Sequence, residues 1–326
     1  MSDDPGNGTD DSGTGSGKDG ADDRKTRVTV LVALAANLVI AVAKAAGGVF
    51  AGSPALLSEA AHSVADSLNE VFLLFALRRS KRPADPQHPF GYGKERYFWA
   101  LLAAVGIFVM GACFSVLQGV EALRGGGEQE STSGYVVGLV VLGVALIAEG
   151  TSLARAVLQV RSQPGKGIGK DPALRTVIAE DGTAVVGVLL AMAGMVLHMV
   201  TGNIAWEASA SIAIGALLGY VAYRLGKDAR EQLIGEAADP ELRRGIEEML
   251  AAQPEIDEVS SLLTMRLGMD STLVAARIDL VPGLESEQVE LTSMRIRGSI
   301  EEAWPEADQV YLDVTDAARA AADDTP

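Results

Sequence analysis

The chain has 326 residues and a formal net charge of -16, and 48% of its residues are hydrophobic. A nucleic-acid-binding protein needs a basic face that releases counterions from phosphates, so this acidic balance argues against that class. The single cysteine, Cys113, excludes an internal disulfide and a metal site built from several thiolates.

Residues 1–24 are rich in Asp, Gly, Ser and Thr, which predicts a disordered acidic tail. Six apolar runs follow, each long enough for a helix to cross a hydrocarbon core of about 30 Å. Six such runs in succession are atypical of buried helices in a soluble protein. We therefore predict an α-helical membrane protein whose residues 25–230 form a six-helix transmembrane domain. The runs lie near 28–50, 54–77, 97–120, 135–159, 174–199 and 203–226.

The linkers between the runs differ in charge. Lys and Arg gather before the first run, between the second and third, between the fourth and fifth, and after the sixth, whereas the other linkers contain little beyond Arg124. The positive-inside rule then places both termini and these two basic loops in the cytoplasm. An even number of spans also requires both termini on one side. We predict that the chain is located in the lipid bilayer of the plasma (inner) membrane and crosses it several times.

Hydropathy changes character after the last run. Helical periodicity at 239–251 and 285–303, and strand-like runs at 258–268, 271–280 and 309–314, predict an α-β-β-α-β order. Such a module can close a small sheet with helices on one face. We predict a cytoplasmic α+β domain over 231–316 and a frayed tail over 317–326.

The second run contains the residues with the most informative chemistry. His62 and Asp66 are four residues apart, so their side chains stand one helical turn apart, about 6 Å along the axis. Asp66 falls near the middle of the span, where ionisable groups are costly and usually functional. A stripe that only joins helices by hydrogen bonds, or a proton relay without metal, would use the same residues. The stripe comprises Glu59, His62, Ser63, Asp66, Asn69 and Glu70.

The fifth run supplies a counterpart at a similar depth, because Glu180 and Asp181 interrupt its apolar sequence. One histidine and two carboxylates are compatible with a tetrahedral N/O metal site. Adjacent residues point about 100° apart on a helix, so both acids cannot face one ion equally well. We predict His62, Asp66 and Asp181 as metal ligands, with Glu180 as the candidate fourth. Lys44, in the first run, is compatible with pairing to an acid of the stripe or with snorkelling.

Imidazole and carboxylate suit Zn(II), and suit Fe(II), Mn(II) or Co(II) nearly as well, whereas Cu(I) prefers thiolates. A ligand imidazole must be neutral, so protons compete with metal at His62. A proton arriving from outside would therefore displace the metal, which is antiport in its simplest form. No cofactor is predicted beyond the transported ion, for which Zn(II) is favoured.

Two motifs resemble the cation diffusion facilitator family of zinc-transporter-type exporters. The first is SPALLSEAAHS, beginning at Ser53 and continuing to Asp66 and Asn69, and the second is DPQHPFGYGKE, beginning at Asp85. The resemblance covers about residues 25–315. It implies a homodimeric metal/proton antiporter that works by alternating access, and a ferredoxin-like cytoplasmic module that dimerises.

Several positions depart from the family pattern. Val177 stands where members commonly carry a fourth ligand, although Gly187 matches a family glycine and supports the alignment of Asp181. In the loop between the second and third runs, Asp85 and His88 match a second family metal site, but Tyr92 replaces its other histidine. This glutamate-aspartate form resembles the branch with mitochondrial-type zinc transporters.

The sequence also supports an expectation for each of two further basic side chains, Lys94 and His198. The resemblance matches Lys94 with a residue that pairs with an acid after the sixth helix in some relatives. Here that place is Gly235, with Glu236 beside it. We expect His198, near the outer end of the fifth run, to be interfacial.

The functional hypothesis is secondary-active efflux of divalent metal cations in exchange for protons. The alternative is a non-transporting membrane subunit or metal sensor, suggested by the uncertain fourth ligand and by a module without histidine or cysteine. We predict no enzymatic activity, since the sequence shows no nucleophile–base pair, phosphate loop or nucleotide motif.

Overall fold

A computed structural model describes residues 16–125, 132–162 and 172–315. It divides into two compact units, Met1–Leu74 with Ala103–Tyr223, and Phe75–Leu102 with Arg224–Pro326. The second unit thus contains the connection between the second and third apolar runs as well as the predicted cytoplasmic module. The predicted boundary at residue 230 stays a prediction, and the predicted C-terminal tail, 317–326, lies outside the described residues.

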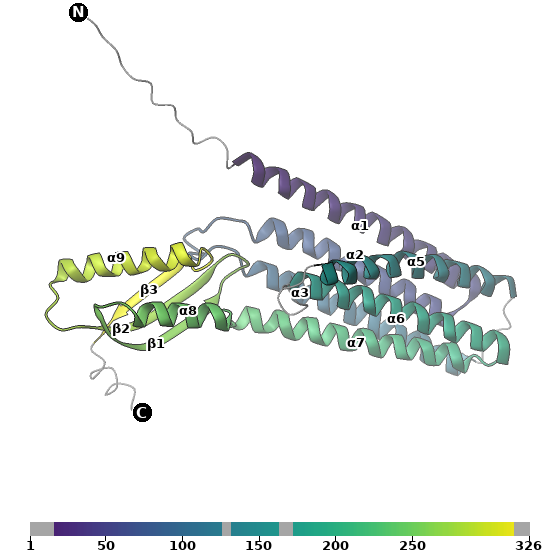
Figure 1. Cartoon of the computed structure of the whole chain (residues 1–326). Coiled ribbons are helices and arrows are strands. Elements are labelled where there is room, and N and C mark those ends of the chain that lie inside the picture. The colour runs from purple at the N-terminus through teal and green to yellow at the C-terminus, as the bar shows by residue number, and fades with distance from the viewer. Residues whose placement is uncertain (1–15, 126–131, 163–171, 316–326) are drawn as a thin grey trace, which may run out of the picture. The chain divides into compact units, whose positions relative to one another are not determined.

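Long helices occupy the predicted apolar runs and lie alongside one another (Figure 1). α1 begins at Ser16, inside the segment predicted as a disordered tail. The third run is continuous but changes its winding, because a π-helical turn, η1, separates α3 from α4. The bounds are α1 Ser16–Ala51, α2 Pro54–Arg79, α3 Glu95–Gly106, η1 Ile107–Cys113, α4 Phe114–Gly125, α5 Thr132–Ser162, α6 Pro172–Thr201 and α7 Ala205–Ile234.

Five candidate membrane spans in the described residues are long and apolar enough to cross a membrane: α1, the continuous α3–η1–α4 segment, α5, α6 and α7. α2 has 26 residues, which is a sufficient length, but its polar stripe makes it less apolar than the others. A multi-pass helical membrane protein is therefore confirmed, and the sixth span stays a prediction.

The α/β module has the predicted element order. It comprises α8 Pro240–Ala251, β1 Ile256–Arg266, β2 Thr272–Leu280, α9 Ser286–Ala303 and β3 Gln309–Val314. β2 lies in the centre of the mixed sheet, antiparallel to β1 and parallel to β3. Ile246 of α8 and Ile296 of α9 pack with Ile278 of β2 in one buried core. Asp239 caps α8 by accepting a hydrogen bond from the Glu241 N–H at 2.9 Å.

The α2–α3 connection packs against the β1–β2 hairpin within the second unit. The Tyr97 hydroxyl donates a hydrogen bond to the carbonyl oxygen of Gly268 at 3.2 Å. Gly93 lies so close to the Leu267 carbonyl oxygen that a Cβ at this position would overlap with it. Lys94 Nζ lies 3.6 Å from Met265 Sδ, and Gly235 also adjoins this methionine. The resemblance matches Lys94 with a residue that pairs with an acid in some relatives. In this structure Lys94 contacts the thioether of Met265.

Candidate metal centre

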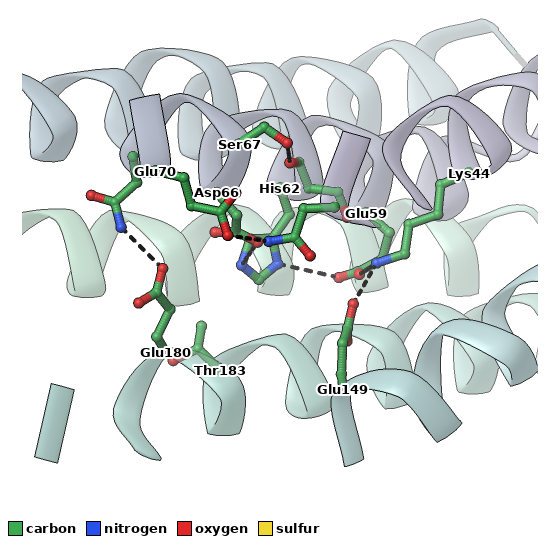
Figure 2. A network of polar contacts seen from close by, with 12 residues as sticks. Lys44, Glu59, His62, Asp66, Ser67, Glu70, Glu149, Glu180 and Thr183 are labelled. Carbon is green, nitrogen blue, oxygen red and sulfur yellow. Dashed lines mark hydrogen bonds and ion pairs between the residues drawn. The ribbon is translucent and has the colours of Figure 1, made fainter. Parts of the chain in front are cut away.

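The polar stripe of α2 is oriented by a well-defined helix start. Pro54 is the first helical residue, and Ser53 precedes it with its hydroxyl accepting a hydrogen bond from the Leu56 N–H at 3.3 Å. From this start, residues three and four apart project from one face. That face brings Glu59, His62 and Asp66 into the interior of the helical bundle (Figure 2).

His62 lies between two carboxylates of its own helix. Its Nε2 is 3.5 Å from Asp66 Oδ2, and its Nδ1 is 3.7 Å from Glu59 Oε1. The His62 side chain is only 4% exposed and that of Glu59 is fully buried, whereas Asp66 keeps 20% of its side-chain surface. The predicted pairing of His62 with Asp66 thus has a geometry that one small ion could bridge.

α6 contributes the two predicted acids in different directions. Glu180 Oε1 accepts a hydrogen bond from Asn69 Nδ2 of α2 at 3.0 Å. Asp181 Oδ2 instead accepts one from the Ser152 hydroxyl of α5 at 2.7 Å. Of the two acids, Glu180 therefore has the direct hydrogen bond to the α2 stripe, although Asp181 was the favoured ligand from sequence.

In the described part of the chain, no three His, Cys, Asp or Glu side chains are grouped closely enough to hold a metal ion together. The predicted ligands lie on facing helices, and the α6 acids are hydrogen-bonded to neighbours rather than directed at His62. Asp181 and Glu180 would therefore have to exchange these hydrogen bonds for metal contacts. His62, Asp66, Asp181 and Glu180 stay a predicted ligand set.

Lys44 joins the stripe to two further helices, a connection that sequence reasoning left open. Its Nζ lies 3.0 Å from Glu59 Oε2 and 3.0 Å from Glu149 Oε1 of α5 (Figure 2). Sequence reasoning missed Glu149, although an isolated carboxylate in a long apolar helix is a signal for a functional site. It also missed Asn37 of α1, whose Nδ2 donates to Glu70 Oε1 at 2.9 Å.

A second polar cluster lies where α2, α5 and α7 begin. The His198 Nδ1 atom is 2.6 Å from Glu207 Oε1 and 2.9 Å from the Tyr135 hydroxyl. The Ser53 hydroxyl donates to the other Glu207 oxygen. Glu207 is completely buried and the His198 side chain is 15% exposed. His198 is therefore part of a buried network that ties four helix ends together, which its sequence position did not indicate.

In the predicted loop site, Asp85 forms hydrogen bonds within its own loop. Asp85 Oδ1 accepts hydrogen bonds from the backbone N–H groups of Gln87 and His88 at 2.9 and 2.8 Å, and Oδ2 accepts one from the Tyr92 hydroxyl at 2.7 Å. His88 Nδ1 lies 3.3 Å from Asp85 Oδ1. The Tyr92 hydrogen bond, with those backbone donors, lowers the pKa of Asp85, and the same bond raises the pKa of Tyr92. Both oxygens thus have hydrogen-bond donors within the loop, and Asp85 with His88 stays a predicted second metal site.

A bundle of long apolar helices that encloses ionisable side chains defines a polytopic membrane protein with a buried polar network. The cation efflux transmembrane domain model matches residues 30–234, more than half of the chain. The protein therefore belongs to the cation diffusion facilitator family.

Named relatives are consistent with this assignment. The chain is 31% identical over 259 residues to the Xenopus laevis mitochondrial proton-coupled zinc antiporter SLC30A9, covering 77% of this chain and 46% of that protein. It is 33% identical over 266 residues to metal tolerance protein C4 of Arabidopsis thaliana, covering 79% and 58%. The chain thus spans about half the length of these two relatives. The cation-efflux pump FieF of Cronobacter sakazakii is 26% identical over 292 residues, covering 87% and 92%.

Proposed function

We propose that this protein exports divalent metal cations across a membrane in exchange for protons, by alternating access. His62 and Asp66 bind the ion from α2, and Asp181 and Glu180 bind it from α6. The observation that carries the proposal is the contact of His62 Nε2 with Asp66 Oδ2, 3.5 Å apart on a buried helix face. Imidazole and carboxylate are a donor set suited to Zn(II) and accessible to Fe(II), Mn(II) and Co(II).

Proton coupling follows from the same donor set, because a ligand imidazole must lose its proton before it binds metal. The Xenopus relative is named a proton-coupled zinc antiporter, which supports both the coupling and the preference for zinc. No resident cofactor is needed, since the metal is the substrate.

The proposed transmembrane arrangement has six spans, with α2 as the sixth. A buried face of ionisable residues is incompatible with lipid contact, but it suits a helix that lines an internal pathway. The proposed setting is the plasma (inner) membrane, with both termini in the cytoplasm and two copies of the chain forming the transporter. Since the relatives named SLC30A9 are mitochondrial, localisation must be measured separately.

The test is metal-dependent proton movement in proteoliposomes, scanned over Zn(II), Fe(II), Mn(II), Co(II) and Cd(II). We expect one or two ions to drive proton flux, and Asp66→Asn and Asp181→Asn to abolish it. Ser67→Ala is the matched control, because Ser67 is a buried α2 residue whose hydroxyl donates only to the Ser63 carbonyl oxygen at 2.9 Å. Silence with every ion, in folded and inserted protein, would favour a non-transporting membrane subunit or metal sensor.

A further inference from the structure

Lys44 is enclosed by helices of the first unit. The residue is 1% exposed, and its ammonium contacts one carboxylate on α2 and another on α5. A charged lysine in such a place is costly unless nearby carboxylates compensate its charge. Snorkelling does not account for it, because the head group points to the Glu59 and Glu149 carboxylates between the helices (Figure 2).

Glu59 connects Lys44 with His62. Its Oε2 accepts the lysine hydrogen bond at 3.0 Å, and its buried Oε1 has no hydrogen-bond partner among the residues that the structure describes. That unpartnered oxygen lies 3.7 Å from His62 Nδ1. Gly187 of α6 closes the other side, because a Cβ there would overlap with Glu59 Oε1. The carboxylate is therefore held in one orientation, with its second oxygen directed at the imidazole.

The two ring nitrogens of His62 consequently face different groups, Nδ1 toward Glu59 and Nε2 toward Asp66. Each carboxylate would favour a hydrogen on the nitrogen that it faces, but Glu59 is fully buried and held by Lys44, whereas Asp66 keeps 20% of its side-chain surface. We therefore expect Glu59 to hold the hydrogen on Nδ1, which leaves the Nε2 lone pair for a metal. We propose that Lys44 is a positioning residue of the cation site, which fixes His62 through Glu59 so that Nε2 is presented to the ion beside Asp66. The binding of an ion at His62 rests on the proposed function, whereas the orientation of the His62 ring by Glu59 does not depend on it.

Glu149 explains how Lys44 can hold this position. One lysine between two carboxylates leaves the three groups with a single net negative charge, and the second carboxylate restrains the ammonium from the α5 side. The double variant K44M/E149Q keeps the formal charge of the three groups at one negative, on Glu59, and removes both contacts of Lys44. It therefore separates positioning from a general change in the electrostatic field near His62.

The experiment uses ring-¹⁵N-labelled histidine in the full chain, at a pH where the imidazoles are neutral. The sequence has three histidines, so the loss of one signal set in His62→Gln assigns His62. In metal-free parent protein we expect the hydrogen on Nδ1, and in K44M/E149Q we expect its loss from that nitrogen. Ser67→Ala, whose hydroxyl donates only to the Ser63 carbonyl oxygen, should leave the His62 signals unchanged. Zn(II) calorimetry on the same samples should show about 10- to 100-fold weaker binding in the double variant.

These measurements distinguish a failure of the positioning role of Lys44 from a failure of the proposed metal site. A hydrogen on Nε2 in the parent, or unchanged His62 signals in the folded double variant, would overturn the positioning role whatever the transport result. The expected signals in a parent that binds no Zn(II) would retain the positioning role and contradict the proposed metal site. If the double variant does not fold, Glu59→Gln decides, since Lys44 keeps Glu149 as partner there. Unchanged His62 signals in Glu59→Gln would also overturn the role.

Discussion

Gly187 of α6 lies directly against the carboxylate of Glu59 on α2, so closely that any Cβ would overlap with Oε1 and contact His62 Nδ1 at 3.5 Å. The two helices thus meet at the buried acid that faces the proposed ligand. Neither residue is predicted to bind the ion, yet their contact sets where the α2 stripe faces α6.

We expect Gly187→Ala to destabilise the protein by about 1–3 kcal/mol, because the added methyl group must displace a buried carboxylate or separate two helices. It should also weaken Zn(II) binding through the displaced Glu59. The free energy of unfolding in detergent and Zn(II) calorimetry are the measurements.

Gly182→Ala is the matched control for stability, since it lies on the same helix and a Cβ there would meet nothing within 4 Å. Alanine has the higher helix propensity, by about 0.5–1 kcal/mol, so this variant should be neutral or more stable. Equal destabilisation of both variants would contradict the overlap at Gly187.

Local rules predicted much of this molecule. The His62–Asp66 pairing follows from a spacing of four on one helix, and the β1–β2 hairpin follows from two strand-like runs around Gly268. These features depend on residues that are near one another in the chain. The π-helical turn within the third run has no comparable signal, since its sequence, IFVMGAC, is an ordinary apolar segment.

The contacts around the site depend on how the helices are rotated against each other. Lys44 and Glu149 are 105 residues apart, and no periodicity along the chain relates them. Similarly, adjacent Glu180 and Asp181 had to face different directions, but the packing of α6 decides that Glu180 meets Asn69 and Asp181 meets Ser152. Patterns in the sequence therefore identify the ionisable residues of a helical bundle more readily than the side chains that these residues contact on other helices.

The Ser53–Glu207 contact predicts a large effect from a small substitution. Ser53→Ala removes the cap of α2, which by itself is worth about 0.5–2 kcal/mol. It also removes a donor to the fully buried Glu207, and a buried polar group that loses its partner costs about 1–3 kcal/mol. We therefore expect a total loss of about 1.5–5 kcal/mol in unfolding free energy. Thr201→Ala, an exposed hydroxyl near the end of α6, should change it by less than about 0.5 kcal/mol.

The proposed sixth span makes a prediction about sidedness. Phe50, close to the end of α1, is 65% exposed, and Gln87 is exposed beyond the end of α2. In a Cys113→Ala background, Phe50→Cys and Gln87→Cys should react with a membrane-impermeant thiol reagent from opposite sides, with Gln87→Cys reacting from the cytoplasm. Asn203→Cys, between α6 and α7, should behave like Phe50→Cys. Reaction of Phe50→Cys and Gln87→Cys from the same side would show that α2 does not cross the membrane.

The α2–α3 connection offers a prediction about pH. The pKa of Asp85 lies below its ordinary value of 3.8, chiefly because the Tyr92 hydroxyl donates to its carboxylate. Tyr92→Phe should therefore raise the pKa of Asp85 toward that value, measured by carboxyl ¹³C NMR. The pKa of Asp313, which is lowered by the hydrogen bond from Arg277, is an internal control that this substitution should leave unchanged.

The sign of the pH effect follows from this direction of shift. Because folding lowers the pKa of Asp85, its hydrogen bonds stabilise the loop above the ordinary value near 3.8 and are lost as the pH falls through the lowered value. The loop signals of the parent should therefore change only below about pH 3.8, and those of Tyr92→Phe at a higher pH than the parent. Coincident titrations in the two proteins would mean that Tyr92 does not hold Asp85 in solution, and would leave that carboxylate free to bind a metal with His88.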